Sequence, residues 1–175
     1  MYQYDAVLFD LDGTLLNTLD DLTDALNHTL RLFGHPLRTA DEVRAFVGNG
    51  VRKLIERALP GGAGDPNMEP ALAAFKQYYT EHCDVRTRPY DGVLEAMAAL
   101  REAGLKLAIV SNKNDEAVRA LSRTFFGSLV GAAVGGRDGV PRKPAPQMPQ
   151  LALEALGAAP ERTLFVGDSD VDMET

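Results

Sequence analysis

The chain has little cysteine, no tryptophan and no excess of basic charge. Cys83 is the single cysteine among 175 residues, so no disulfide can form within the chain. A lone cysteine fits a reducing compartment, and we expect a cytoplasmic protein. The formal net charge is −7, whereas a general nucleic-acid binder needs a basic face. We therefore expect no nucleic-acid partner.

Long apolar runs are also missing. The first residues lack the basic segment and the apolar stretch of a signal peptide. No run approaches the roughly 18 apolar residues of a membrane span, so we expect no membrane partner. A chain of 175 residues can bury a sizeable core, which predicts one domain with room for a small second lobe.

Short apolar runs alternate with helical patterns over most of the chain. The expected strands are residues 4–9, 105–110, 129–134 and 163–166. Strands that alternate with helices are typical of a parallel sheet with right-handed crossovers. We therefore predict an α/β fold with a three-layer, Rossmann-like parallel sheet.

The stretch between the first two strands is expected to be helical throughout. Apolar residues recur at helical spacing from Leu19 to Phe33, and Thr39 with Glu42 forms a capping box. Another helix is expected after Pro70. We expect an inserted helical lobe over residues 17–87 and a sheet domain formed by residues 1–16 and 88–175. The two links between the lobe and the sheet domain would act as a hinge.

Asp10 and Asp12 directly follow the first apolar run and precede Gly13. Ligands of an open parallel sheet bind just beyond the carboxyl ends of its strands. An acid pair at that position is a candidate nucleophile and proton donor, or a metal site. A lone pair of this kind is usually a turn or a helix cap, so its meaning depends on partners elsewhere in the chain.

Such partners are present at other strand ends and loops, namely Ser111, Lys143, and Asp168 with Asp172. Four carboxylates that converge on one point repel one another, and without a cation some would be protonated. Their oxygens, with no His or Cys nearby in these motifs, select a hard ion such as Mg²⁺. A lysine and a hydroxyl beside them suit a phosphoryl group in transfer.

These features resemble the four motifs of the haloacid dehalogenase superfamily, in the same order. The matching segments are Asp10-Leu11-Asp12-Gly13-Thr14, Ser111 after an apolar strand, Lys143-Pro144, and Gly167-Asp168 through Asp172. The helical stretch has the position and size of the superfamily's first-type cap. Two further segments, Val47-Gly48-Asn49-Gly50 with Glu56-Arg57-Ala58-Leu59 and Ser111-Asn112-Lys113, resemble the phosphoglycolate phosphatase subfamily.

The resemblance implies a Mg²⁺-dependent phosphomonoester hydrolase that acts through an aspartyl-phosphate. Asp10 would be the nucleophile, and Asp12 the proton donor and acceptor, with its main-chain carbonyl on the metal. The implied catalytic residues are Asp10, Asp12, Ser111 and Lys143, and the implied metal ligands are Asp10, Asp12, Asp168 and Asp172. Asp172 would either ligate the metal or orient a ligand.

The implied partner is a small phosphorylated metabolite, with phosphoglycolate as the leading substrate. The expected substrate-binding residues are Thr14, Asn112, Gly48, Asn49 and Arg52. The Gly48–Asn49 segment also fits a simple helix break, and Asn112 also fits a helix cap. A β-phosphoglucomutase-like phosphotransferase, a phosphatase for another sugar or nucleotide ester, and an inactive binding protein of the same fold stay open, as do monomer and homodimer.

Members of the superfamily continue past the last motif with another helix and at least one more strand, whereas this sequence stops at Thr175. We therefore expect the sheet to lack its last strand, either by truncation or as a short variant. The strand left at the edge would expose apolar surface beside Asp168 and promote aggregation. The activity of this exact polypeptide is accordingly open.

Overall fold

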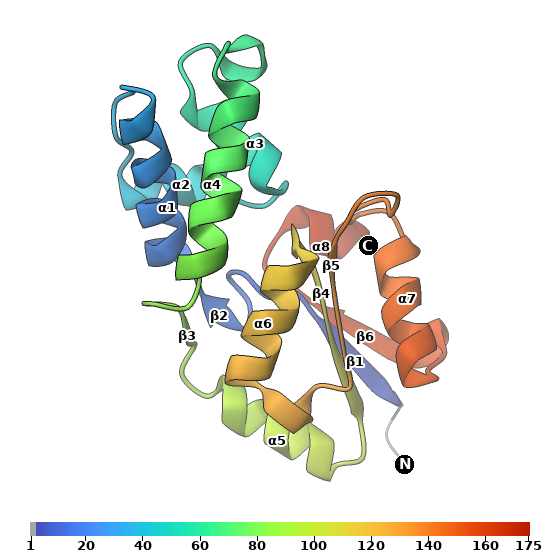
Figure 1. Ribbon diagram of the computed structural model, residues 1–175. Coiled ribbons are helices and arrows are strands. Elements are labelled where there is room, and N and C mark those ends of the chain that lie inside the picture. Colours follow the sequence, from blue (N-terminus) through green and yellow to red (C-terminus); the bar gives the residue numbers. More distant parts are fainter. Residues whose placement is uncertain (1–2) are drawn as a thin grey trace. The chain divides into compact units, whose positions relative to one another are not determined.

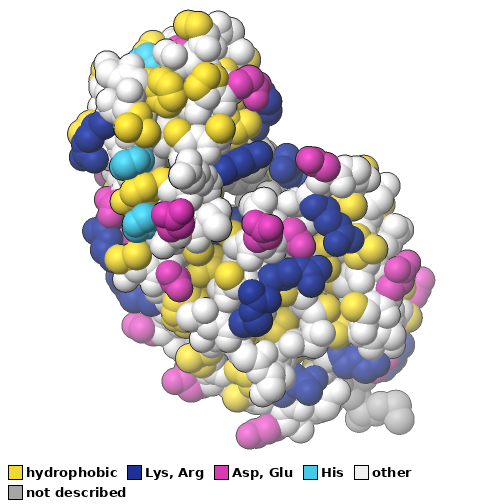
Figure 2. Space-filling view, viewed as in Figure 1, with side chains coloured by type: hydrophobic (Ala, Val, Ile, Leu, Met, Phe, Trp, Pro, Cys, Tyr) yellow, Lys and Arg dark blue, Asp and Glu magenta, His cyan; other side chains and the backbone are white. Residues whose placement is uncertain are grey.

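The computed structural model describes residues 3–175, which divide into two compact units (Figure 1). The sheet unit contains residues 3–17 and 88–175, and the helical unit contains residues 18–87. Among the described residues, no helix combines the length and the apolar character needed to cross a membrane. On the face that Figure 2 shows, acidic and basic side chains are interspersed over both units.

The sheet unit is built on four parallel strands in the order β5-β4-β1-β6. β1 (Ala6–Phe9) pairs with β4 (Lys106–Asn114) on one side and with β6 (Thr163–Val166) on the other, and β5 (Ala132–Gly136) lies beyond β4. All four residues of β1 are buried, as expected for a strand that is covered on both faces. The parallel arrangement brings the carboxyl ends of β1, β4 and β6 to one edge of the sheet.

Helices cover both faces of this sheet (Figure 1). α7 (Gln147–Leu156) packs on one face through Met148, Ala152 and Leu153, which contact buried residues of β1, β4 and β5. α5 (Val93–Glu102) and α6 (Asp115–Phe125) lie on the other side. The predicted α/β class with a Rossmann-like parallel sheet is confirmed.

Three of the four strands differ from their predicted bounds. β1 begins at Ala6, two residues after its predicted start. β4 continues past the expected end at Val110 as far as Asn114, so Ser111 lies inside the strand. β5 begins at Ala132, because residues Gly127–Leu129 form a 3₁₀ turn instead. Asn, Lys and Gly are poor strand formers, so the pattern of apolar residues underestimates these ends. A register shift between Ser111 and Asn114 accommodates them.

β6 lies at the edge of the sheet, and it exposes part of its apolar surface. Leu164 and Val166 each keep 39% of their surface exposed. The chain then turns through Gly167 into the short helix α8 (Asp170–Glu174), whose capping box joins Ser169 and Asp172. The 3₁₀ turn Pro160–Arg162 precedes β6.

The helical unit consists of four helices and one 3₁₀ turn. They are α1 (Leu19–Leu32), α2 (Ala40–Phe46), α3 (Val51–Ala58), the turn Gly62–Gly64 and α4 (Met68–His82). The predicted capping box is confirmed, since Thr39 and Glu42 bond each other's backbone N–H. α4 starts two residues before Pro70, where an earlier start is possible because the first helical turn tolerates proline.

The chain passes between the two units twice, and the segments on either side of these two links contact each other within each unit. In the sheet unit, β2 (Leu16–Asn17) pairs antiparallel with β3 (Arg88–Pro89). In the helical unit, the Asp21 carboxylate is 3% exposed and accepts hydrogen bonds from the backbone N–H groups of Arg86 and Thr87, at 3.0 and 2.8 Å. Asp21 therefore holds the end of the unit against its beginning.

We predict that Asp21→Ala lowers the free energy of unfolding by about 2–3 kcal/mol, because two backbone donors lose a charged, buried acceptor. Urea denaturation measures the effect. Asp24→Ala is the matched control, since Asp24 pairs with the same Arg86 on the surface and an exposed ion pair contributes about 0–1 kcal/mol. Equal losses in the two variants would contradict the assignment.

Candidate active site

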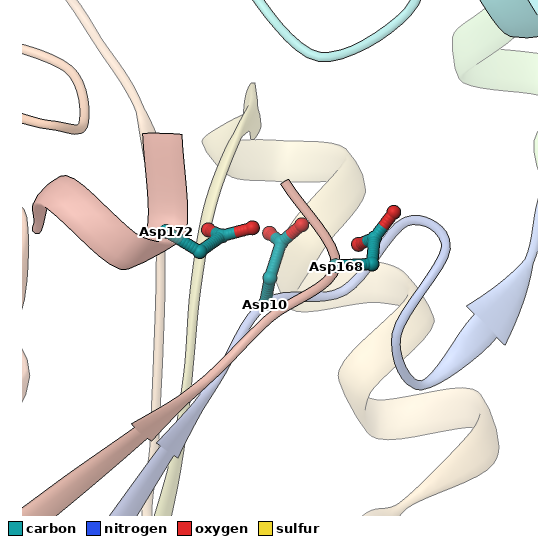
Figure 3. Close-up of side chains that lie close together, drawn as sticks. All are labelled: Asp10, Asp168 and Asp172. Atoms are coloured by element: carbon teal, nitrogen blue, oxygen red, sulfur yellow. The ribbon is translucent and has the colours of Figure 1, made fainter. Parts of the chain in front are cut away.

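Acidic side chains from β1 and from the chain after β6 converge at the carboxyl edge of the sheet. Asp10 follows β1 directly, Asp168 lies in the turn after β6, and Asp172 lies in α8. Figure 3 shows the three carboxylates side by side, with Asp10 between Asp172 and Asp168. One oxygen from each can be chosen so that the three atoms lie within 4.8 Å of one another.

Lys143 places a positive charge inside this group of acids. Its Nζ lies 2.9 Å from Oδ1 of Asp10 and 2.6 Å from Oδ1 of Asp172, and its side chain is 2% exposed. The ammonium group also lies 5.1 Å from the ring centre of Phe165 in β6, an attractive cation–π arrangement. The Nδ2 of Asn112 donates to the main-chain oxygen of Lys143 at 3.0 Å, which fixes the loop that carries it.

The surroundings drive the pKa values of the two carboxyl groups apart. Burial is the main reason that the pKa of Asp10 rises to about 6, and the charges of Asp12 and Asp172 add to it while Lys143 opposes it. Burial also raises the pKa of Asp172, but hydrogen bonds from Lys143 and Ser169 outweigh burial and bring that pKa below its usual range. Asp172 is therefore the stronger acid of the pair.

The residues present fit a hard divalent cation. Oδ1 of Asp10 is buried and accepts no hydrogen bond among the described residues, so its contact with Lys143 is an ion pair alone. Buried polar atoms without a hydrogen bond call for an ion or a water. Asp168 is exposed and accepts a hydrogen bond from Thr14 at 2.8 Å, which orients its carboxylate. Carboxylate oxygens in this number and spacing suit Mg²⁺.

Gly13 lets the turn after β1 approach Asp168 closely. Its φ of 87° is favourable for glycine alone, and a Cβ at this position would lie 2.5 Å from Oδ2 of Asp168. The two turns that carry acids are therefore packed against each other with no room for a side chain at residue 13.

The side chain of Asp12 has a partner that the sequence did not indicate. Nζ of Lys113 lies 2.7 Å from Oδ1 of Asp12, and the two side chains are 6% and 15% exposed. Lys113 lies in β4, in the part of the strand that extends beyond the predicted end. Its signal in the sequence is its place in the Ser111-Asn112-Lys113 segment, which did not indicate a contact with Asp12.

Ser111 and Asn112 lie on β4 next to β1. The register pairs Phe9 with Ile109, so Asp10 is level with Val110 and Ser111 lies one residue beyond it. Ser111 is 3% exposed, and its Oγ accepts a hydrogen bond from the backbone N–H of Lys113 at 3.4 Å. The alternative role of Asn112 as a helix cap is wrong, because Asn114 caps α6.

Three predicted substrate-binding residues lie in the helical unit. Gly48 and Asn49 precede α3, and Oδ1 of Asn49 accepts a hydrogen bond from Arg57 at 2.8 Å. Arg52 is paired with Glu69 of α4 at 2.5 Å. These contacts stabilise the helical unit itself, and substrate binding by Gly48, Asn49 and Arg52 stays a prediction.

The protein is thus an α/β protein with an acid cluster at the carboxyl edge of a parallel sheet. Comparison with known proteins identifies its family. The sequence model of one protein family, the haloacid dehalogenase-like hydrolases, matches residues 4–175. The chain therefore belongs to this family. The resemblance seen in the sequence is thereby confirmed.

Individual relatives of this chain are phosphatases by name. The phosphoglycolate phosphatase of Aquifex aeolicus is 37% identical over 169 residues, which cover 96% of this chain and 78% of that protein. The N-acetylmuramic acid 6-phosphate phosphatase of Pseudomonas aeruginosa is 38% identical, over 97% of this chain and 76% of that protein. The crystal structure of a predicted phosphoglycolate phosphatase from Haemophilus somnus superimposes with a TM-score of 0.90 and 31% identity, over 99% of this chain and 81% of that one.

We predict that Gly13→Ala weakens Mg²⁺ binding about 10- to 100-fold, because the new methyl group displaces Asp168. Isothermal titration with Mg²⁺ measures the affinity. Gly92→Ala is the matched control, since Gly92 has a φ of 82° and a Cβ there would meet no described heavy atom within 4 Å. Unchanged Mg²⁺ affinity in the Gly13 variant would show that Asp168 does not hold the metal.

We also predict that Mg²⁺ affinity depends on pH around 6. A metal ligand must be deprotonated, and Asp10 with a pKa of about 6 is mostly protonated at pH 5 and mostly ionised at pH 7. The dissociation constant for Mg²⁺ should therefore rise about tenfold as the pH falls from 7 to 5. Titrations across this range test it. Asp10→Asn should bind more weakly and lose the dependence, and a flat profile in the unaltered protein would contradict the prediction.

Proposed function

We propose that the protein is a Mg²⁺-dependent phosphomonoester hydrolase whose substrate is phosphoglycolate. The observation that carries the proposal is the buried Asp10 carboxylate, held by Lys143 and flanked by Asp168 and Asp172 at the open edge of the sheet. Such a group can attack the phosphorus of an anionic ester only where cations offset the repulsion. Lys143 supplies one positive charge, and a Mg²⁺ ion held by the acids would supply the rest. The 37% identity to the phosphoglycolate phosphatase of Aquifex aeolicus supports the choice of substrate.

In the first step, an oxygen of Asp10 attacks phosphorus and the bond from phosphorus to the ester oxygen breaks. Asp12 donates its proton to that oxygen, so the alcohol leaves as a neutral group. Lys143 reduces the repulsion between Asp10 and the phosphoryl group, and Ser111 donates a hydrogen bond to a phosphoryl oxygen. Thr14 keeps Asp168 in place, since it already donates to that carboxylate.

In the second step, Asp12 takes a proton from water, which attacks the aspartyl-phosphate. The bond from phosphorus to the Asp10 oxygen breaks, inorganic phosphate leaves and the carboxylate is restored. Mg²⁺, held by Asp10, Asp168, the main-chain carbonyl of Asp12 and directly or indirectly Asp172, would neutralise charge on the phosphoryl oxygens in both steps.

The helical unit would serve as the cap that selects the leaving group. We assign this role to Gly48 and Asn49, which belong to a segment that resembles the phosphoglycolate phosphatase subfamily, and to Arg52, which follows that segment. A small diffusible substrate and a single, buried Cys83 fit a cytoplasmic enzyme.

A sugar phosphate is the second candidate substrate. The N-acetylmuramic acid 6-phosphate phosphatase of Pseudomonas aeruginosa is 38% identical to this chain, about as close as the phosphoglycolate phosphatases. A panel that compares kcat/KM for phosphoglycolate, N-acetylmuramic acid 6-phosphate and hexose phosphates decides between them. Highest turnover of a sugar phosphate would overturn phosphoglycolate while leaving the hydrolase chemistry intact.

We predict that Asp10→Asn abolishes hydrolysis of p-nitrophenyl phosphate, lowering kcat at least 1000-fold, because the amide cannot form the aspartyl-phosphate. The unaltered protein should lose activity in EDTA and regain it with Mg²⁺. Acid quenching with ³²P-labelled substrate should trap a phosphorylated protein that Asp10→Asn lacks. Retained turnover in this variant would refute the nucleophile, and full activity in EDTA would refute the metal dependence.

A further inference from the structure

A second nearly buried lysine, Lys113, lies beside Asp12, the residue that protonates the leaving oxygen in the proposed reaction. Lys143 is engaged by Asp10 and Asp172, around the attacking group. Lys113 is engaged by Asp12 instead, with its Nζ 2.7 Å from Oδ1 and its side chain 6% exposed. The two ammonium groups therefore contact different carboxylates of the site.

We infer that Lys113 binds the carboxylate of the substrate and selects esters that carry a carboxylate on the carbon next to the ester oxygen. The inference rests on the proposed function, in which Asp12 protonates that oxygen. It names Lys113, in the sheet unit, as a residue that determines specificity.

Distances place the ammonium group within reach of such a carboxylate. A proton donor must lie about 2.6–3.2 Å from the oxygen that it protonates. Because Nζ of Lys113 lies 2.7 Å from Asp12, it stays within about 6–8 Å of the ester oxygen whichever carboxylate oxygen makes the contact. In a 2-phosphoryloxy carboxylate, two single bonds separate the ester oxygen from the carboxyl carbon, a span of about 2.5 Å. A carboxylate oxygen extends about 3.5 Å from the ester oxygen, so it can contact Nζ of Lys113 when Nζ and the ester oxygen are within about 6 Å of each other. That condition is met when Oδ1 of Asp12, the oxygen paired with Lys113, contacts the ester oxygen.

Charge explains why a lysine is needed there. A substrate carboxylate at this position approaches Asp12 and the acid cluster of Asp10, Asp168 and Asp172, and like charges repel. The net charge of −7 gives no general attraction for an anion. A compact ammonium group beside Asp12 offsets this repulsion locally, and an ester without a carboxylate does not need it.

A narrower role is also testable. If Lys113 only orients Asp12, its removal must slow every substrate by the same factor, because every ester needs the same proton. If Lys113 also binds the carboxylate, removal must slow acidic substrates more than neutral ones. The ratio of two substrates therefore separates recognition from positioning.

The experiment compares 2-phosphoglycolate with 2-hydroxyethyl phosphate, which replaces the carboxylate by a hydroxymethyl group and keeps the ester. In the unaltered protein, kcat/KM should favour phosphoglycolate. Lys113→Met should reduce that preference at least tenfold, mainly through a higher KM for phosphoglycolate. Lys113→Arg should retain part of the preference, since it keeps the charge. Lys76→Met, at an exposed lysine of α4, is the control and should leave kcat/KM unchanged for both substrates.

Each outcome has a distinct meaning. If the unaltered protein does not prefer phosphoglycolate, the proposed substrate fails first. If it does prefer phosphoglycolate and Lys113→Met keeps the ratio, the inference is overturned whatever happens to the absolute rates. If the methionine variant loses all turnover, two other variants, Lys113→Arg and Lys113→Gln, are assayed with p-nitrophenyl phosphate as the substrate and glycolate as the inhibitor. Glycolate inhibition that is equally strong with arginine and with glutamine would also overturn it.

Discussion

The site depends on one buried contact, the Lys143 ammonium group between the carboxylates of Asp10 and Asp172. Removing a charge from water is unfavourable unless opposite charges and hydrogen bonds replace the water. Here the strand order provides them. β1 and β6 are neighbours, so the acids that follow them end up around the same lysine, and Phe165 of β6 lies beside its ammonium group. The sheet topology thus makes the buried lysine possible, and the lysine keeps the acids together.

The two carboxylates that contact Lys143 differ in their hydrogen bonds and in their pKa values. Asp172 receives additional hydrogen bonds from the backbone and side chain of Ser169. Asp10 receives none at Oδ1, and its pKa is raised to about 6 while that of Asp172 is lowered. Asp172 therefore acts as the fixed counter-ion of Lys143. The ionised form of Asp10 is therefore poorly stabilised by the protein alone. This suits a group that a bound cation would stabilise before it attacks phosphorus in the proposed reaction.

The sequence predicted the parts of the site that follow from strand ends. Asp10, Lys143 and Asp172 could be grouped because residues that follow the carboxyl ends of parallel strands, or lie in the adjacent loops, meet at one edge of the sheet. The contact between Lys113 and Asp12 could not be predicted, since 101 residues separate the pair and nothing in the apolar pattern marked β4 as continuing to Asn114. The hydrogen bond from Asn112 to the Lys143 carbonyl could not be predicted either. The two residues are 31 positions apart, and their contact depends on how the loop that carries Lys143 packs.

In the proposed reaction, the two lysines would let one acid pair perform two tasks. Asp10 and Asp12 are two residues apart, yet their nearest cations come from different elements: Lys143 from the loop before α7, and Lys113 from β4. Each carboxylate is therefore fixed independently of the other, despite their short separation along the chain. An attacking group and a proton donor must approach opposite ends of the same phosphorus–oxygen bond. Separate counter-ions allow this, whereas a single shared cation would draw both acids to one point.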